Sequence, residues 1–142
     1  FKPLINARLE TIDEKVSFKK LIKLHRCVAI ADGFYEWKRE EKNKTPYYFL
    51  REDKKTIYIA AIYENNEFCL ITEQSSKNVN EIHHRQPVIL NETDVNRYLN
   101  LELSGSNFLK ESKKTNLTFY EISKEVNKPT NNSISLIQQK IN

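Results

Sequence analysis

Four consecutive segments with β-strand character constrain the fold more than any other feature of this sequence. All four are rich in β-branched and aromatic residues. They cover residues 26–38, 46–51, 56–63 and 67–72. Turn-forming residues interrupt or separate them at Asp32-Gly33, 53–55 and Asn65-Asn66. Connections this short join antiparallel neighbours, so the sequence predicts a mainly antiparallel β core.

Helical signals flank this β-rich region. Apolar residues recur among Lys and Glu in residues 12–24, which predicts an amphipathic helix with Thr11 as its N-cap and Glu14 three residues later. Further elements are expected as a helix or turn at 76–83, a strand at 87–90, helices at 91–100 and 106–114, a strand at 117–126 and a helix at 133–141. We therefore predict an α+β fold with a barrel-like β core and flanking helices.

Size and composition exclude several classes of protein. With 142 residues, of which 39% are hydrophobic, the chain has the usual length of one domain and enough apolar residues for one core. No apolar run approaches the ~18 residues that a membrane span needs, and only 2 glycines occur, too few for a glycine-rich phosphate loop. The net charge of +4 permits a polyanionic partner without requiring one.

The cysteines and histidines do not form a metal-ligand pattern. Cys27 and Cys69 lie in apolar stretches without CxxC spacing, which favours buried thiols in a reducing compartment. His83 and His84 are adjacent, but His25 is far away in the sequence. They could be surface residues, catalytic groups or part of a phosphate-binding loop. We expect no metal and no organic cofactor.

Four polar segments are candidates for a functional site. They are residues 6–11, residues 33–38, Thr72 with the residues after it, and residues 82–87. Within the second segment, strand alternation puts Phe34 and Glu36 on one face. Glu36 is therefore either an outward-facing carboxylate on a half-buried strand or a carboxylate in a partly apolar pocket, where it could transfer protons.

The same segments contain groups suited to nucleic acid. Arg8 and Arg85 offer rigid guanidinium forks to phosphate. Trp37 and its aromatic neighbours Tyr35 and Phe34 offer flat faces for base stacking, although they could equally be core residues. A basic and aromatic groove is typical of proteins that bind single strands.

Taken in order, these segments resemble the SRAP family, the SOS response-associated peptidase domain. The resemblance rests on residues 5–11, Arg26-Cys27, residues 33–38 and 45–49, Ile71-Thr72, residues 82–90, Val126-Asn127 and Asn131-Asn132. Their order and spacing match over essentially the whole chain. The resemblance implies a mixed α+β fold around a barrel-like β core, with a positively charged groove for single-stranded DNA.

The resemblance also implies an activity. Members of the family process abasic sites in the DNA damage response and link to them covalently. A leading Cys captures the ring-opened sugar as a thiazolidine, some members show lyase activity, and self-processing accounts for the peptidase name. Asn6, Glu36 and His83 match the family's residues at the abasic sugar. The matches to DNA-contacting positions are Arg8, Trp37, Thr72 and Arg85.

The leading Cys of the family has no counterpart in this sequence, since neither Cys27 nor Cys69 has a free α-amine. We expect residues 1–142 to form a single SRAP domain that holds about the C-terminal two thirds of the family domain. The expected partner is single-stranded DNA with abasic sites, bound by a monomer in the bacterial cytoplasm, nucleoid-associated when on DNA. A Cys-dependent peptidase and a non-catalytic single-strand-binding module remain as alternatives.

Overall fold

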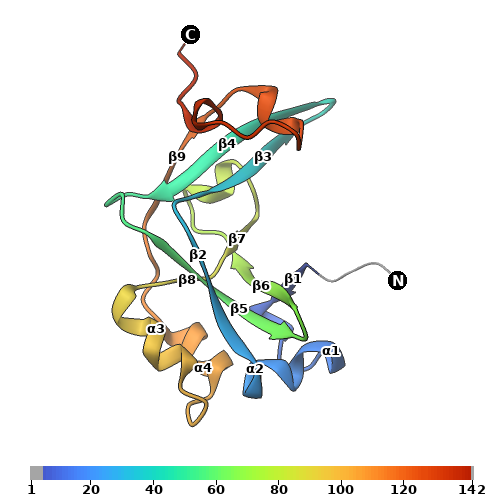
Figure 1. Cartoon of the computed structure of the whole chain (residues 1–142), viewed down its shortest axis with the longest axis vertical. Helices are drawn as coiled ribbons and strands as arrows, with labels where there is room; N and C mark the ends of the chain where they lie inside the picture. Colours follow the sequence, from blue (N-terminus) through green and yellow to red (C-terminus); the bar gives the residue numbers. More distant parts are fainter. Residues whose placement is uncertain (1–4, 142) are drawn as a thin grey trace.

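A computed structural model describes residues 5–141 as two β-sheets with short helices around them (Figure 1). The six-stranded sheet has the order β1-β6-β5-β2, with β7 beside β6 and β8 beside β5. Its strands are β1 Asn6–Arg8, β2 Arg26–Ala31, β5 Ile57–Glu64, β6 Glu67–Gln74, β7 Arg85–Pro87 and β8 Ile89–Leu90. The three-stranded sheet has the order β3-β4-β9, with bounds Phe34–Glu40, Asn43–Arg51 and Leu117–Glu121.

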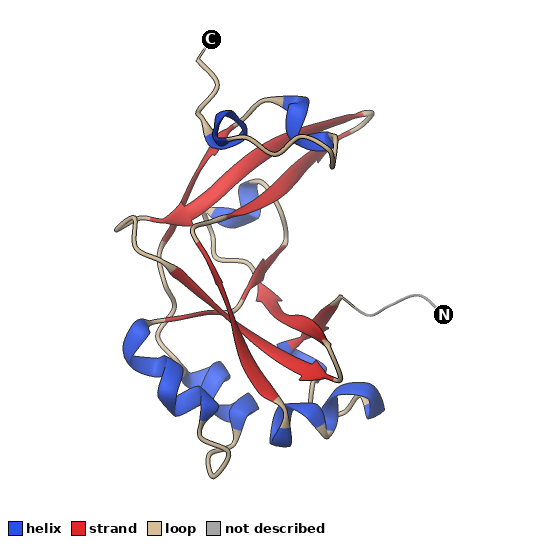
Figure 2. Ribbon diagram, viewed as in Figure 1, coloured by secondary structure: helices blue, strands red, loops and turns tan. Residues whose placement is uncertain are grey.

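The predicted fold class is confirmed. All strand pairs are antiparallel except β1 with β6, and helices flank the sheets (Figure 2). Within residues 5–141 the strands lie in two separate sheets and do not close into a barrel. The chain passes from one sheet to the other at Asp32-Gly33, between β2 and β3.

The turns lie at the positions that were predicted from the sequence. Asn65, between β5 and β6, has a φ of 54°, and Lys54, between β4 and β5, has a φ of 58°. Asn adopts this left-handed conformation at low cost, which suits it to a tight hairpin. The Lys-rich stretch 40–44 forms the exposed β3–β4 turn.

The predicted helix over residues 12–24 is confirmed only in part, over residues 16–24 and with a break at Lys20. The structure has a 3-10 turn at Leu9–Thr11 (η1) and two single-turn helices, α1 Val16–Lys19 and α2 Leu21–Leu24. Lys15 has an extended backbone that separates η1 from α1, so Thr11 caps nothing. Val16 is 91% exposed while Leu21 and Ile22 are buried, so the apolar residues do not share one face.

The C-terminal segment also differs from its prediction. The expected helix at 133–141 is a single 3-10 turn, η4 Ile134–Ile137, in which only Leu136 is buried. The expected strand at 117–126 ends at Glu121, and a 3-10 turn, η3 Lys124–Asn127, follows it. The remaining helices match their predictions as η2 Val79–Glu81, α3 Glu92–Leu99 and α4 Gly105–Glu111.

Two apolar clusters hold the elements together. One packs the six-stranded sheet against the helices and includes Ile22, Tyr98 and Leu109. The other includes Phe49 and Ile59 and joins the two sheets. The fold thereby presents the ends of several strands at the junction between the sheets.

A buried arginine ties the six-stranded sheet to the helices. Arg26 donates hydrogen bonds to the carbonyl oxygens of Tyr98 at 2.8 Å and Leu103 at 2.9 Å. Its guanidinium also lies over the Tyr98 ring. Burial lowers the pKa of Arg26 below its ordinary value. Of the Arg26-Cys27 part of the resemblance, Arg26 therefore lies in the core and Cys27 is half-buried.

Gly33 lets the chain between β2 and β3 pack closely against β4, and Gly33→Ala is expected to destabilise the protein. A Cβ at this position would overlap the Tyr48 ring and the Phe49 carbonyl oxygen. We expect a loss of about 1–3 kcal/mol in the free energy of unfolding, measured by urea denaturation. Lys42→Ala, in the exposed β3–β4 turn, is the control, because this side chain is in solvent. Equal stability of the two variants would contradict the prediction.

Candidate functional site

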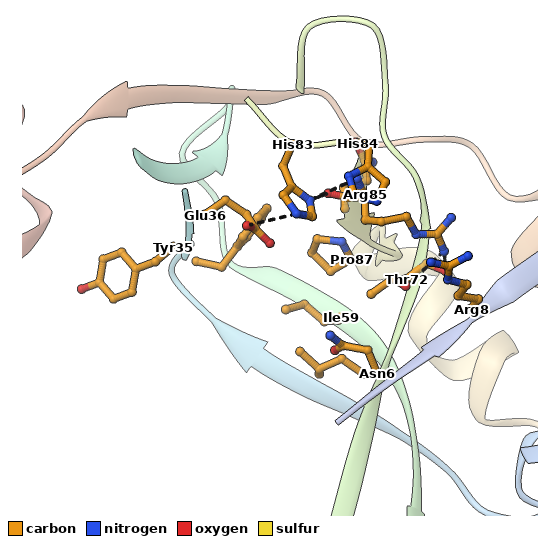
Figure 3. Close-up of a pocket in the computed structure, with 13 residues that line it drawn as sticks. Asn6, Arg8, Tyr35, Glu36, Ile59, Thr72, His83, His84, Arg85 and Pro87 are labelled. Atoms are coloured by element: carbon orange, nitrogen blue, oxygen red, sulfur yellow. Dashed lines mark hydrogen bonds and ion pairs between the residues drawn. The ribbon is translucent and has the colours of Figure 1, made fainter. Parts of the chain in front are cut away.

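A pocket of about 420 Å³ opens between the two sheets, where β1, the start of β3, the end of β6 and β7 meet (Figure 3). Six of the seven site residues predicted from the sequence line it. They are Asn6, Arg8, Glu36, Thr72, His83 and Arg85. The other lining residues are Phe34, Tyr35, Ile59, Leu70, His84, Gln86 and Pro87. Polar and apolar groups thus share one cavity.

Strand pairing explains why these residues meet. Asn6 and Arg8 flank the fully buried Ala7, so both point away from the core. The parallel β1–β6 pair sets Arg8 opposite Thr72, and the antiparallel β6–β7 pair sets Thr72 opposite Pro87. The register therefore brings residues from three distant parts of the sequence side by side.

Glu36 and His83 form the polar centre of the pocket. The Nε2 atom of His83 lies 3.9 Å from Oε2 of Glu36, and the two side chains are only 26% and 28% exposed (Figure 3). Of the two interpretations of Glu36, the structure therefore favours a carboxylate in a partly apolar pocket. An imidazole and a carboxylate at this separation can hold a hydroxyl or water between them and exchange protons with it.

The His83 ring is held from its other side by the main chain of Arg85. Its Nδ1 atom lies 2.9 Å from the Arg85 carbonyl oxygen and 3.1 Å from the Arg85 amide nitrogen. These contacts leave Nε2 directed toward Glu36.

Glu10 is a polar neighbour of the pocket to which the sequence analysis gave no role. Its carboxylate accepts hydrogen bonds from both terminal nitrogens of Arg85, at 2.8 and 2.9 Å. These bonds lower the pKa of Glu10 to about 2. Arg85 also donates to the carbonyl oxygen of Thr72 at 2.9 Å and to its hydroxyl at 3.1 Å. The only signal in the sequence was the place of Glu10 within the polar segment 6–11.

Arg8 and Trp37 occupy different settings. Arg8 is exposed, and its guanidinium makes no hydrogen bond or ion pair with residues 5–141. Trp37 lies outside the pocket, and its indole N–H donates to Asn127 at 2.7 Å. It borders a separate hollow of about 350 Å³, also lined by Arg39, Asn80, Ile82, His83 and His84. The two hollows share the two histidines.

The two cysteines lie away from the pocket. Cys69 is buried and Cys27 is half-buried. Burial raises the pKa of the Cys69 thiol to about 11 and raises that of Cys27 as well. Both thiols are therefore poor nucleophiles at neutral pH.

The structure of residues 5–141 also bears on metal sites and on membrane spans. No group of three or more His, Cys, Asp or Glu side chains in this range is arranged to hold a metal ion. No helix in the same range is both long and apolar enough to cross a membrane.

The chain is similar to known proteins over nearly its whole length. The family model described as SOS response associated peptidase (SRAP) matches residues 1–129. The abasic site processing protein YoqW of Bacillus subtilis is 33% identical over 149 residues, covering 95% of this chain and 66% of the relative. YedK of Escherichia coli, also named an abasic site processing protein, is 34% identical over 111 residues, covering 72% and 50%.

Two solved structures share the fold of this chain. The crystal structure of a protein from Bacteroides thetaiotaomicron superposes with a TM-score of 0.83 at 29% identity, covering 96% of this chain and 66% of that one. A phage-related protein from Bordetella bronchiseptica, 23% identical with a TM-score of 0.70, shares the fold over 86% of this chain and 68% of its own. The chain spans just under two thirds of the YoqW protein and half of the YedK protein.

Proposed function

Because the chain belongs to the SOS response associated peptidase (SRAP) family, we propose that its pocket binds an abasic site in single-stranded DNA as part of an abasic site processing protein. One observation carries the proposal. The pocket combines a guanidinium without a partner in residues 5–141, Arg8, with the close Glu36–His83 pair. Arg8 suits a backbone phosphate, and the pair suits proton transfer at the adjacent sugar.

The proposed reaction is covalent capture of the sugar. The α-amine of a leading Cys condenses with the ring-opened aldehyde and releases one water to form an imine. The thiolate then adds to the imine carbon, the nitrogen takes up a proton, and a thiazolidine ring closes. Glu36 and His83 carry the protons that ring opening and imine formation require. Asn6 and Thr72 lie beside them in the pocket and are proposed to bind the free hydroxyl of the ring-opened sugar.

The nucleophile is proposed to come from outside residues 1–142. Cys27 and Cys69 have amide nitrogens instead of free amines, and their thiols do not line the pocket. We propose that these residues form one domain that supplies the DNA-binding and proton-transfer groups, while an upstream segment supplies the Cys. Trp37, beside the second hollow, is proposed to stack on a base that neighbours the abasic site.

Arg8→Ala tests the DNA partner. If Arg8 contacts one phosphate, the variant should bind every single-stranded sequence more weakly, and the slope of log affinity against log salt should fall by about 0.7. The measurement is a fluorescence-anisotropy titration with labelled oligonucleotides at several salt concentrations. Lys19→Ala, an exposed cation on α1 outside the pocket, is the control. A flat salt dependence of the unaltered chain would remove DNA as the partner.

A further inference from the structure

Two pairs of residues near the C-terminus, Val126-Asn127 and Asn131-Asn132, have no part in the proposed function. Asn127 is the last residue of η3, and its side-chain oxygen accepts the hydrogen bond of the Trp37 indole N–H at 2.7 Å. The two residues are 90 positions apart in the sequence. The segment after β9 therefore reaches back to the strand that borders the pocket.

The register of the three-stranded sheet explains why Asn127 meets Trp37. Trp37 lies opposite Pro46 in the β3–β4 pair. The amide of Ile122, just after β9, donates to the Pro46 carbonyl oxygen at 3.1 Å, so the chain leaves the sheet beside this pair. The C-terminal segment then runs beside β3 and β4 (Figure 1).

Side-chain contacts support the turn that carries Asn127. The hydroxyl of Ser123 accepts a hydrogen bond from the Glu125 amide at 3.2 Å. The side-chain amide of Asn131 donates to the Glu125 carbonyl oxygen at 2.8 Å. Together with the backbone hydrogen bonds of η3, these contacts fix the turn from both ends. Asn131 therefore supports the residue that holds Trp37.

The bond to Asn127 holds the indole by its edge. An indole N–H lies in the plane of the ring and can only donate, so its acceptor restrains the ring without covering either face. Tyr35 meets the Trp37 ring at 57°, with centroids 6.5 Å apart, in a tilted contact instead of a stack. Trp37 also borders the hollow that shares His83 and His84 with the pocket. A base that stacks on a protein needs such a restrained ring with an open face.

We infer that Asn127 is a positioning residue for Trp37: it holds the indole by its N–H so that one ring face stays open to a base of single-stranded DNA. The restraint on the ring concerns the protein alone, whereas the stacking rests on the proposed function. In this arrangement Asn127 acts through Trp37 and takes no part in the reaction at the sugar.

The first test measures the motion of Trp37 in the protein alone. The chain has a single Trp, so its time-resolved fluorescence anisotropy reports this ring. Asn127→Ala should add a fast component to the anisotropy decay, because the edge of the indole is released. In Asn127→Asp a carboxylate oxygen can still accept the bond, so the slow decay should return. Asn107→Ala, an exposed residue of α4, is the matched control and should change nothing. An unchanged decay in Asn127→Ala, with the fold intact by circular dichroism, would overturn the inference.

A double-mutant cycle tests whether Asn127 acts through the indole. Asn127→Ala should weaken binding to a labelled, undamaged single-stranded oligonucleotide about 2- to 10-fold, the usual worth of one hydrogen bond. Trp37→Phe keeps an aromatic face but has no N–H to donate. When Asn127→Ala is added to Trp37→Phe, no further loss should follow. A further loss of the same size would show that Asn127 acts by another route and would overturn the inference.

Quenching of Trp37 fluorescence by single-stranded DNA separates this inference from the proposed function. Stacking should quench the unaltered chain, and Asn127→Ala should reduce the quenching that remains at saturating DNA. Binding without quenching, or equal quenching in the two proteins, would overturn the stacking part. If the unaltered chain bound no single-stranded DNA, the proposed function would fail, whereas the anisotropy decay would still decide whether Asn127 holds Trp37.

Discussion

The chain of residues 1–142 is expected to form no heat-stable adduct with abasic single-stranded DNA, although it should bind that DNA. A thiazolidine needs an amine and a thiolate on adjacent carbons of one Cys, and only an N-terminal Cys has both. Cys27 and Cys69 have amide nitrogens, and burial raises the pKa of both thiols. The reacting pair is therefore missing from this chain, while the groups that line the pocket are present.

The measurement is a denaturing gel of protein incubated with an oligonucleotide that carries one abasic site. Extending the chain upstream to a leading Cys should produce a slower-migrating band, and changing that Cys to Ala should abolish it. The double variant Cys27→Ser/Cys69→Ser of the extended protein is the matched control and should retain the band. Efficient crosslinking by residues 1–142, lost in Cys27→Ser or Cys69→Ser, would place the nucleophile inside this chain instead.

Glu36→Gln is expected to slow crosslinking by the extended protein about 10²- to 10⁴-fold, the usual contribution of a positioned acid or base. The amide keeps the size of the carboxylate but cannot accept a proton from the sugar or support a charged His83. DNA binding should change little, because the proposed phosphate contact is Arg8. Single-turnover kinetics with saturating protein separate the rate from the affinity.

Glu40→Gln is the matched control for this prediction. Glu40 lies on the same strand, β3, but is exposed, pairs with Lys38 and does not line the pocket. It should react at the unaltered rate. Equal rates for Glu36→Gln and Glu40→Gln would show that the 3.9 Å pair of Glu36 and His83 takes no part in the chemistry.

The predictions that succeeded depend on short-range chemistry. The β segments and their turns follow from alternating and β-branched residues bounded by Asn, Asp and Gly, all of which act within a few positions. The helix expected over 12–24 forms only as two single turns: Ile12, Leu21 and Ile22 enter the same core cluster, while Val16 is left in solvent. Helical periodicity alone does not say which apolar residues will find a partner.

Only the family resemblance predicted that the residues of the candidate site lie together. Composition and local pattern single out Glu36, His83 and the arginines as candidates, but they do not say that these residues share a cavity. Trp37 was grouped with them and lies beside a separate hollow, bound to Asn127. Glu10 was given no role and pairs with Arg85, which lies 75 positions away in the sequence.

The sequence by itself determined most local units, among them the strands between residues 26 and 74 and the turns that join them, but it did not predict β1 as a strand. The tertiary structure alone decided which units meet. The parallel pairing of β1 with β6, the register that sets Arg8 beside Thr72, and the ion pair between Glu10 and Arg85 join distant residues. Such pairings form because they bury apolar side chains and satisfy backbone hydrogen bonds across the whole domain, and no local pattern contains that information.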